Sequence, residues 1–402
     1  MKRVVITGQG TINSLGGNVA QTLESLREGR LGIGPMVFTD VERLSIRIGG
    51  QVHDFKPEDH FNRQEIALYD RFTQFAIYAA REAVTQSGLV FRDELAAQTG
   101  VILGTAGGGL QTQDENYRSV YEAGKNRVHP FVVPRLMNNA AASHVSMIHN
   151  LQGPSYTVAT ACASSNHAMG QAFNLVRAGV SKVMLTGGSE AMLCFGGIKA
   201  WEGLRVMSPD GCRPFCATRN GMVQGEGAAI FVFEELAHAQ ARGAEILAEI
   251  AGFSMTSDAS DIVMPSKQGA ARAISGALRD AKMNPASVGY INAHGTGTAA
   301  NDKTECAAVS DVFGGDADYL MISSTKSMHG HLIGGTGAVE LLACIMALKD
   351  GVIAPTIGYR AADPECALDF VPNTARDHKV DAALSNAFAF GGLNAVLALR
   401  AI

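Results

Sequence analysis

The segment that most restricts the fold of this chain spans residues 136–176, where no Asp, Glu, Lys or Arg occurs. A membrane-spanning helix needs about 20 mostly apolar residues. Asn138, Pro154 and Ser164 interrupt this segment and leave no window of that kind. The segment is therefore predicted to lie deep in the core of a folded protein, with Cys162 inside it.

Charge and composition exclude several classes of protein. The 402 residues have a net charge of −5 and are 47% hydrophobic, which is too apolar for a disordered chain. The chain also lacks the basic excess of a nucleic-acid-binding protein. The apolar run at residues 4–6 is too short for the core of a signal peptide. Seven cysteines, an odd number without a tight framework, predict a reducing, cytoplasmic location.

Strands and helices alternate along the chain, which predicts an α/β fold. The predicted strands span residues 3–7, 101–103, 156–159, 182–185, 246–251, 288–292 and 320–323. The predicted helices span residues 65–86, 164–179, 234–243, 270–282, 304–312 and 337–349. Glycines predict a turn at residues 8–10 and the end of a strand at Gly187-Gly188.

The chain contains a weak internal duplication. The strand at 156–159 leads into a polar loop at Cys162 and then a helix, and the strand near 320–323 leads into a polar loop at 326–331 and then a helix. We therefore predict two halves of one doubled fold, residues 1–240 and 241–402. Each half would present reactive groups where a strand meets a helix.

Reactive side chains occur at three such junctions. Cys162 precedes a helix, whose N–H groups stabilise a thiolate, although most free cysteines are simply small buried side chains. His294 follows one strand, and Lys326 and His331 follow the next, although each histidine alone is more often an ordinary polar residue. A thiol with two imidazoles suits acyl transfer through a thioester. Glu305 is a candidate ion-pair partner for Lys326, or else a charge near a helix N-terminus.

Three other kinds of site are disfavoured. The glycine-rich segment 104–109 has no Gly-Lys-Ser/Thr and no acidic partner about 20 residues later, so close approach to a chain-like ligand or a dimer partner fits it better than a nucleotide. Cys212 and Cys216 have no second pair of zinc ligands nearby. No Gly-x-Ser-x-Gly nucleophile elbow of a serine hydrolase is present.

Four longer motifs occur in order along the chain. They are Thr160-Ala161-Cys162-Ala163-Ser164-Ser165, Asn292-Ala293-His294-Gly295-Thr296-Gly297-Thr298, Ser324-Thr325-Lys326-Ser327-Met328-His329-Gly330-His331 and Asn386-Ala387-Phe388-Ala389-Phe390-Gly391-Gly392. Together they resemble the 3-oxoacyl-[acyl-carrier-protein] synthases of the elongating, type II branch, and the resemblance runs from Arg3 to the C-terminus. Residues 261–266 and Met328-His329 look most like the nodulation protein E group, whose members help to make unusual acyl chains.

This resemblance implies a thiolase-like fold, with duplicated halves in a five-layered αβαβα sandwich, usually as a homodimer. It identifies Cys162 as the nucleophile that accepts the acyl group, and His294 and His331 as the pair that serves malonyl decarboxylation. Lys326 and Glu305 would form a supporting ion pair.

The implied reaction is a decarboxylating Claisen condensation with malonyl-acyl-carrier protein, which elongates a fatty-acid, polyketide or polyene-type chain. Backbone N–H groups of Cys162 and Phe390 would hold the oxyanion. Phe390 would also gate an acyl pocket that Phe388 helps to line. The resemblance implies no metal and no cofactor.

Departures from the family pattern concern substrate choice. Gly107 stands where relatives often have a bulky residue, which predicts a longer or wider acyl tunnel. Ala389 and Leu393 replace a Gly and a Thr of the usual gate, so gate motion is less defined. The cations expected to meet an acidic carrier protein, if they are not simply surface charge, are Arg63, Arg71, Arg127 and Arg205.

Three alternatives stay open at this point. A thiolase-like enzyme that uses coenzyme A normally has a second catalytic Cys near the C-terminus, and Cys366 lies away from the Phe390 motif. A non-catalytic chain-length subunit typically lacks the nucleophile that Cys162 provides. The chain could also be the active half of a ketosynthase/chain-length-factor heterodimer in secondary metabolism.

Overall fold

The computed structural model describes all residues from Met1 to Ile402, and its main feature is one ten-stranded mixed sheet. The strands of this sheet are β1 (Val4–Asn13), β4 (Thr99–Gly104), β5 (Ser155–Val158), β6 (Val183–Glu190), β7 (Gly227–Glu235), β8 (Ala248–Ser257), β9 (Tyr290–Asn292), β10 (Met321–Ser323), β13 (Ala382–Ala389) and β14 (Leu393–Arg400). Their spatial order is β10-β9-β13-β14-β8-β1-β7-β6-β4-β5. Two short pairs lie outside it, β2 (Gly34–Pro35) with β3 (Ile48–Gly49) and β11 (Val352–Ile353) with β12 (Arg376–Asp377).

The sheet consists of two five-stranded halves with the same pattern. In the first half, β1 is antiparallel to β7 and β7 to β6, while β6, β4 and β5 run parallel. In the second half, β8 is antiparallel to β14 and β14 to β13, while β13, β9 and β10 run parallel. The halves join where Val4–Ile6 of β1 pair with β8. The predicted duplication is therefore visible in the topology.

The chain forms fourteen α-helices. They are α1 (Val19–Glu28), α2 (Arg63–Leu68), α3 (Arg71–Ser87), α4 (Asp93–Ala97), α5 (Leu110–Tyr121), α6 (Val132–Leu136), α7 (Ala140–His149), α8 (Ser164–Ala178), α9 (Phe195–Gly203), α10 (Leu236–Ala241), α11 (Lys267–Ala281), α12 (Ala299–Phe313), α13 (Lys326–His329) and α14 (Thr336–Lys349). Short 3-10 turns occur at η1 (Val41–Arg43), η2 (Pro57–Asp59), η3 (Ala161–Ala163), η4 (Pro285–Ser287), η5 (Gly314–Tyr319) and η6 (Ile333–Gly335).

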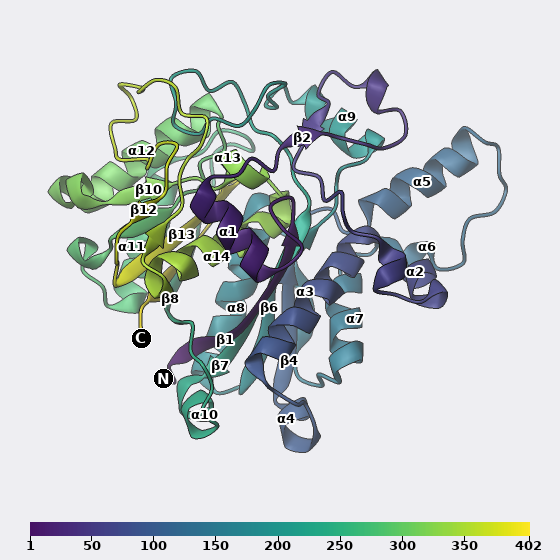
Figure 1. Cartoon of the computed structure of the whole chain (residues 1–402), viewed down its shortest axis with the longest axis horizontal. Coiled ribbons are helices and arrows are strands. Elements are labelled where there is room, and N and C mark those ends of the chain that lie inside the picture. Colours follow the sequence, from purple (N-terminus) through teal and green to yellow (C-terminus); the bar gives the residue numbers. More distant parts are fainter.

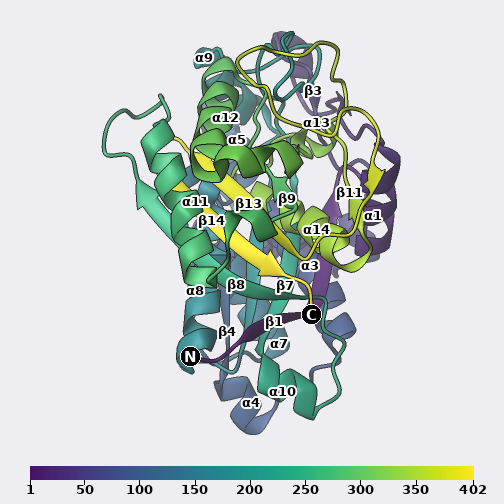
Figure 2. The ribbon, with the colours of Figure 1, turned by 90° about the vertical axis from the view of Figure 1, so that its left-hand side faces the viewer.

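The helices and the two halves of the sheet form five layers (Figures 1 and 2). Helices α3 and α7 pack on the outer face of the first half, and α11, with α12 beside it, packs on the outer face of the second. Helices α8 and α14 contact strands of both halves and form the central layer. The predicted α/β fold with a five-layered, duplicated architecture is confirmed.

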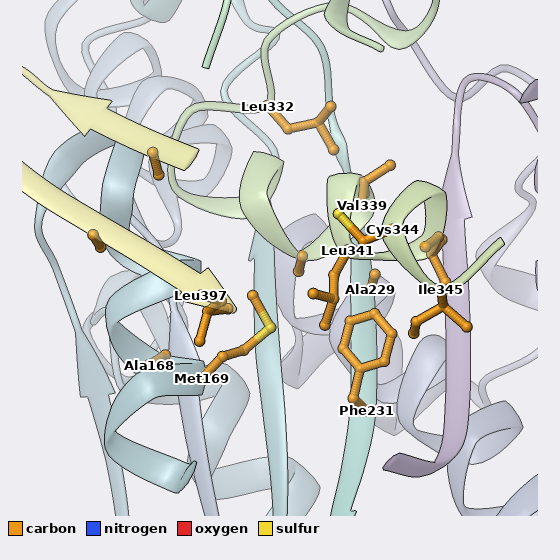
Figure 3. Close-up of a cluster of buried hydrophobic side chains, with 14 of the residues drawn as sticks. Ala168, Met169, Ala229, Phe231, Leu332, Val339, Leu341, Cys344, Ile345 and Leu397 are labelled. Atoms are coloured by element: carbon orange, nitrogen blue, oxygen red, sulfur yellow. The ribbon is translucent and has the colours of Figure 1, made fainter. Parts of the chain in front are cut away.

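The central layer is the apolar core of the protein. Every residue of α14 from Thr336 to Leu348 is buried, which is the pattern of a helix surrounded on all sides. Figure 3 shows Leu341 and Ile345 of this helix in one cluster with Met169 of α8 and Phe231 of β7. Burial of each such side chain is worth roughly 1.5–3 kcal/mol, so this layer holds the two halves together.

The helix predicted over residues 65–86 is in fact two helices. The first ends at Leu68, and Asp70 caps the second by accepting a hydrogen bond from Phe72 N at 3.1 Å. The same carboxylate also accepts a hydrogen bond from Thr112 N of α5 at 2.8 Å. The apolar spacing continues across the break, which is why periodicity alone did not reveal it.

The turn predicted at residues 8–10 and the strand end predicted at Gly187-Gly188 are wrong. Both segments lie inside strands, β1 and β6. A Cβ atom on Gly8 would lie 2.2 Å from the carbonyl oxygen of Ala83, and one on Gly10 would lie 2.0 Å from that of Ala79. These glycines thus allow α3 to pack directly against β1.

The prediction that the uncharged segment 136–176 is all deep core is only half right. Helix α8 belongs to the central layer, but β5 is the last strand at one edge of the sheet. Tyr156 on β5 is 41% exposed, and Met147 on the neighbouring α7 is 65% exposed. Absence of charge here therefore marks a surface as well as a core.

Among all the helices, none combines the length and the apolar character needed to cross a membrane.

We predict that Gly10→Ala destabilises the fold by about 1–3 kcal/mol, because the new methyl group overlaps the α3 backbone. Urea unfolding followed by circular dichroism would measure this change. Gly34→Ala is the matched control, because nothing lies within 4 Å of the position of its Cβ. Equal stability of the two variants would contradict the packing argument.

Candidate active site

Four chain segments bring Cys162, His294, Lys326 and Phe390 to one edge of the sheet. Strands β9, β10 and β13 are parallel, so their carboxyl ends lie at the same edge, and His294, Lys326 and Phe390 follow them. Cys162 comes from the first half, on the turn η3 between β5 and α8. Turn η3 packs against β13 and thereby brings Cys162 to the residues of the second half.

Cys162 lies on a strained turn at the start of α8. The preceding Ala161 has φ 48°, a left-handed conformation that is uncommon without glycine. Ser164 Oγ stabilises this turn by accepting a hydrogen bond from Thr160 N at 2.9 Å and donating one to the carbonyl oxygen of Ala161 at 2.7 Å. The turn points a buried thiol, 6% exposed, into the space in front of the sheet edge.

Burial raises the pKa of the Cys162 thiol to about 12. The positive charge of Lys326 and the backbone N–H groups of Phe390 and Cys162 act in the opposite direction. Desolvation therefore outweighs the stabilisation that the sequence predicts from the helix N-terminus, and the resting group is a thiol. The two N–H groups at the sulfur are in place to stabilise negative charge that develops there.

His294 and His331 face each other beside this thiol. Their ring centroids are 5.5 Å apart, and the donor atoms of Cys162, His294 and His331 all lie within 4.8 Å of one another. Burial, with a contribution from the charge of Lys326, lowers the pKa of both imidazoles well below the usual value. Both rings are therefore neutral at physiological pH.

Hydrogen bonds set the tautomer of His331. Ile333 N donates to His331 Nδ1 at 3.2 Å, so in the neutral ring the proton is on Nε2. That Nε2 is buried and has no hydrogen-bond partner. A neutral donor is thus available at the cavity that contains the thiol.

The predicted ion pair between Lys326 and Glu305 is wrong in its partner. Lys326 pairs instead with Glu340 of α14, and both side chains are at most 1% exposed. Glu305 accepts hydrogen bonds from the backbone N–H groups of His294 at 2.9 Å and Gly295 at 2.7 Å, and from the side chain of Asn386. Glu305 therefore fixes the loop that carries His294, while Glu340 neutralises the buried ammonium group.

Apolar side chains form the walls of the cavity at Cys162, which has a volume of about 100 Å³. Phe388 and Phe390 both line it, as expected from the sequence. Trp201, the one tryptophan of the chain, stacks on Phe390 with ring centroids 5.9 Å apart at an angle of 21°. Trp201 was missed in the sequence because its helix carries no motif.

Gly107 does not line this cavity. Side-chain atoms of Met192 lie 3.2 to 3.3 Å from the position that a Cβ atom on Gly107 would occupy. The space left by the missing side chain is therefore filled by Met192, which contradicts a wider tunnel at this point.

Three of the four predicted docking cations are exposed. Arg63, Arg127 and Arg205 are on the surface. Arg71 binds the buried carboxylate of Glu226 through both Nε and Nη2, and is not a free surface cation. The prediction for Arg71 is therefore wrong.

The donor set Cys162, His294 and His331 fits a metal ion poorly. A metal ligand needs an unprotonated ring nitrogen, whereas the bond from Ile333 N leaves the proton of His331 on Nε2. The ammonium group of Lys326 acts on all three groups and would repel a cation.

Comparison with known proteins gives consistent matches. Residues 1–239 match the model of the beta-ketoacyl synthase N-terminal domain, and residues 247–360 match that of the C-terminal domain. Nodulation protein E of Rhizobium sp. (strain N33) is 46% identical over all of both chains. The 3-oxoacyl-[acyl-carrier-protein] synthase 2 of Staphylococcus aureus (strain N315) is 42% identical over 99% of this chain and 98% of its own. The solved structure described as the ishigamide ketosynthase/chain length factor superposes with a TM-score of 0.96 at 36% identity, over 100% of this chain and 99% of the other.

We predict that Lys326→Met destabilises the protein by about 3–5 kcal/mol, because it leaves the Glu340 carboxylate buried without its partner. The double variant Lys326→Met/Glu340→Leu should recover most of this loss. Alkylation of Cys162 by iodoacetamide should be slower in both variants than in the unchanged protein, because Lys326 lowers the pKa of that thiol. Alkylation as fast as in the unchanged protein would contradict the electrostatic role of Lys326.

Proposed function

The chain belongs to the beta-ketoacyl synthase family, and from this premise we propose how its residues carry out the condensation. It is an acyltransferase that joins acyl units in fatty-acid or polyketide synthesis. The observation that carries the assignment of residues is the meeting of one buried thiol and two neutral imidazoles within 4.8 Å.

In the first step, the sulfur of Cys162 attacks the carbonyl carbon of an acyl thioester. A new C–S bond forms, the bond to the carrier sulfur breaks, and the thiol proton leaves with the carrier thiol. The oxyanion of the intermediate accepts hydrogen bonds from the backbone N–H groups of Phe390 and Cys162, which already lie at the sulfur.

In the second step, malonyl-carrier loses CO2 in front of the two histidines. The bond between the α-carbon and the carboxylate carbon breaks, and its electrons form an enolate of the thioester. Burial and the charge of Lys326 keep the pKa values of His294 and His331 well below the usual range, so both rings are neutral and can donate hydrogen bonds to the enolate oxygen. One well-aimed donor of this kind is worth about 3–4 kcal/mol.

In the third step, the α-carbon attacks the acyl carbonyl on Cys162. A C–C bond forms, the C–S bond breaks, and the sulfur of Cys162 leaves as a thiolate that takes up a proton from water to restore the resting thiol. The 3-oxoacyl product leaves on its carrier. The cavity walls, including Phe388 and the stacked pair Phe390 and Trp201, exclude water that would hydrolyse the acyl-enzyme.

The alternatives from the sequence receive less support. Cys366, the only candidate for a second catalytic thiol, is buried in the outer cluster with Cys306 and does not line the cavity at Cys162. A chain-length subunit would not need a nucleophile, whereas here Cys162 lies beside His294 and His331.

An acyl-carrier protein is the partner that this chemistry requires. We propose that Arg63, Arg127 and Arg205, which are exposed, contribute to its docking. We propose that the chain divides into residues 1–240 and 241–402, with the boundary at the end of α10. We also propose a cytoplasmic location.

We also propose a homodimer that forms through β5. This strand is an uncovered edge of the sheet, and such edges readily pair with another chain. Exposed apolar side chains lie on it and beside it: Tyr156 on the strand, Met147 on the adjacent α7, and Met137 next to Asn138, whose carbonyl oxygen accepts a hydrogen bond from Thr157 of β5. The similar ketosynthase/chain length factor structure makes a heterodimer the alternative.

The reaction is tested by incubating the protein with malonyl-carrier and a panel of acyl-carriers, followed by mass spectrometry of protein and products. Cys162→Ala should form no acyl adduct and no condensation product. His294→Ala and His331→Ala should still become acylated, but decarboxylation should fall by about 10²–10³-fold, because each removes one donor. Absence of an adduct on Cys162 in the unchanged protein would overturn the proposal.

The dimer is tested by light scattering. The unchanged protein should have twice the mass of one chain, and Tyr156→Asp should shift it toward the monomer, because it buries a charge in the interface. Val90→Asp replaces an exposed residue away from β5 and should have no effect. An unchanged protein that is monomeric by itself would favour the heterodimer.

A further inference from the structure

The second half of the fold contains a turn equivalent to the one that carries Cys162. Turn η6 precedes α14 as η3 precedes α8, and Ile333 has the same φ of 48° as Ala161. Turn η3 packs on β13, and η6 packs on the equivalent strand β6. Gly334 is therefore the counterpart of Cys162, and the second half has no nucleophile at this place.

A carboxylate occupies the space in front of this second turn. Glu190 is the last residue of β6 and is fully buried. Its Oε2 accepts hydrogen bonds from Ala106 N at 2.7 Å and Gly334 N at 3.0 Å. Its Oε1 accepts from Thr105 Oγ at 2.8 Å and Gly107 N at 3.1 Å.

The chemistry of this site suits an anion. Three backbone N–H groups and one hydroxyl converge on the two oxygens, and no Lys or Arg forms an ion pair with Glu190. Backbone N–H groups that converge in this way form an anion-binding cavity. The arrangement parallels the first half, where N–H groups of Phe390 and Cys162 surround the reacting sulfur.

We infer that Glu190 is a positioning residue whose carboxylate fills the anion-binding cavity of the inactive half and so holds the turn that sets His331. This inference rests on the proposed function of His331. It also explains the glycine-rich segment 104–109, two of whose N–H groups bind Glu190.

The path from Glu190 to His331 consists of adjacent hydrogen bonds. Glu190 binds Gly334 N, and the carbonyl oxygen of Gly334 accepts a hydrogen bond from Ser165 of α8, so Gly334 is held on both sides. The neighbouring Ile333 N donates to His331 Nδ1 and keeps the proton on Nε2. Thr336 Oγ, one residue beyond the turn, lies 2.8 Å from the same Nδ1. Release of this turn would leave the tautomer and direction of His331 unset.

The test separates the two half-reactions in Glu190→Gln. The amide NH2 group would face backbone N–H donors, so part of the hydrogen-bond set is lost. We expect malonyl decarboxylation to fall by about 10–100-fold, while acylation of Cys162 changes by less than about threefold. Equal losses in both half-reactions, or no loss in either, would overturn the inference.

A second measurement, the rate at which iodoacetamide alkylates Cys162, should rise in the same variant. The negative charge of Glu190 raises the pKa of Cys162, so Cys162 in Glu190→Gln should be alkylated faster than in the unchanged protein at each pH between ~8 and ~10. A general loosening of the fold would also speed alkylation, so Ser189→Ala serves as the matched control. It removes a buried hydrogen bond to Phe72 from the neighbouring residue, and should leave both the alkylation profile and the ratio of half-reactions unchanged.

Thr105→Val covers the case in which Glu190→Gln does not fold. It removes one of the four hydrogen bonds and leaves the charge in place. Its decarboxylation should fall while its alkylation profile stays that of the unchanged protein, and an unaltered decarboxylation rate would contradict the inference. If the unchanged protein showed no condensation activity, that result would contradict the proposed function. The alkylation rates of the variants could still be compared in that case.

Discussion

Exclusion of water from the space between the two half-sheets controls every group at the site. It raises the pKa of the Cys162 thiol, lowers that of the two histidines and raises that of Glu190 to about 7 and of Glu340 to about 7. In water these side chains would be a partly ionised mixture. In the dry central layer the histidines become neutral donors, and the one buried ammonium group requires its own carboxylate. The apolar packing of α8 and α14 is therefore part of the chemistry as well as of the stability.

The sequence predicted the parts of the site that follow strands. Cys162, His294, Lys326 and His331 were found because parallel strands bring their carboxyl ends together, a rule that needs no coordinates. Glu340 was missed because it is the one acidic residue in a helix that is otherwise mostly apolar, although a buried acid in such a helix needs a buried cation. Glu305 was identified as a site residue, but its contacts were not, because Glu305 and Glu340 lie on different helices and distance along the chain does not show which carboxylate reaches Lys326.

The misplaced turns have a common cause. Gly8 and Gly10 indicate a turn when only local conformation is considered, yet they are glycine because α3 contacts the strand at that point. In the same way, the charge-free segment was read as core, although its edge strand β5 leaves apolar side chains on the surface. A local sequence pattern shows which conformations and contacts a residue allows. Only the packed structure shows which of these contacts is made.

The two chain ends share an anchor on the side of the sheet opposite the active site. Arg3 and Arg400 both form ion pairs with Glu249 of β8. Strand β14 runs from Leu393, beside the gate, to Arg400, a length of roughly 25 Å. A carrier domain fused to either end would therefore begin at the end of the strands that lies away from the cavity at Cys162. Its tether would have to run the full depth of the fold before the attached thioester reached the mouth of the cavity.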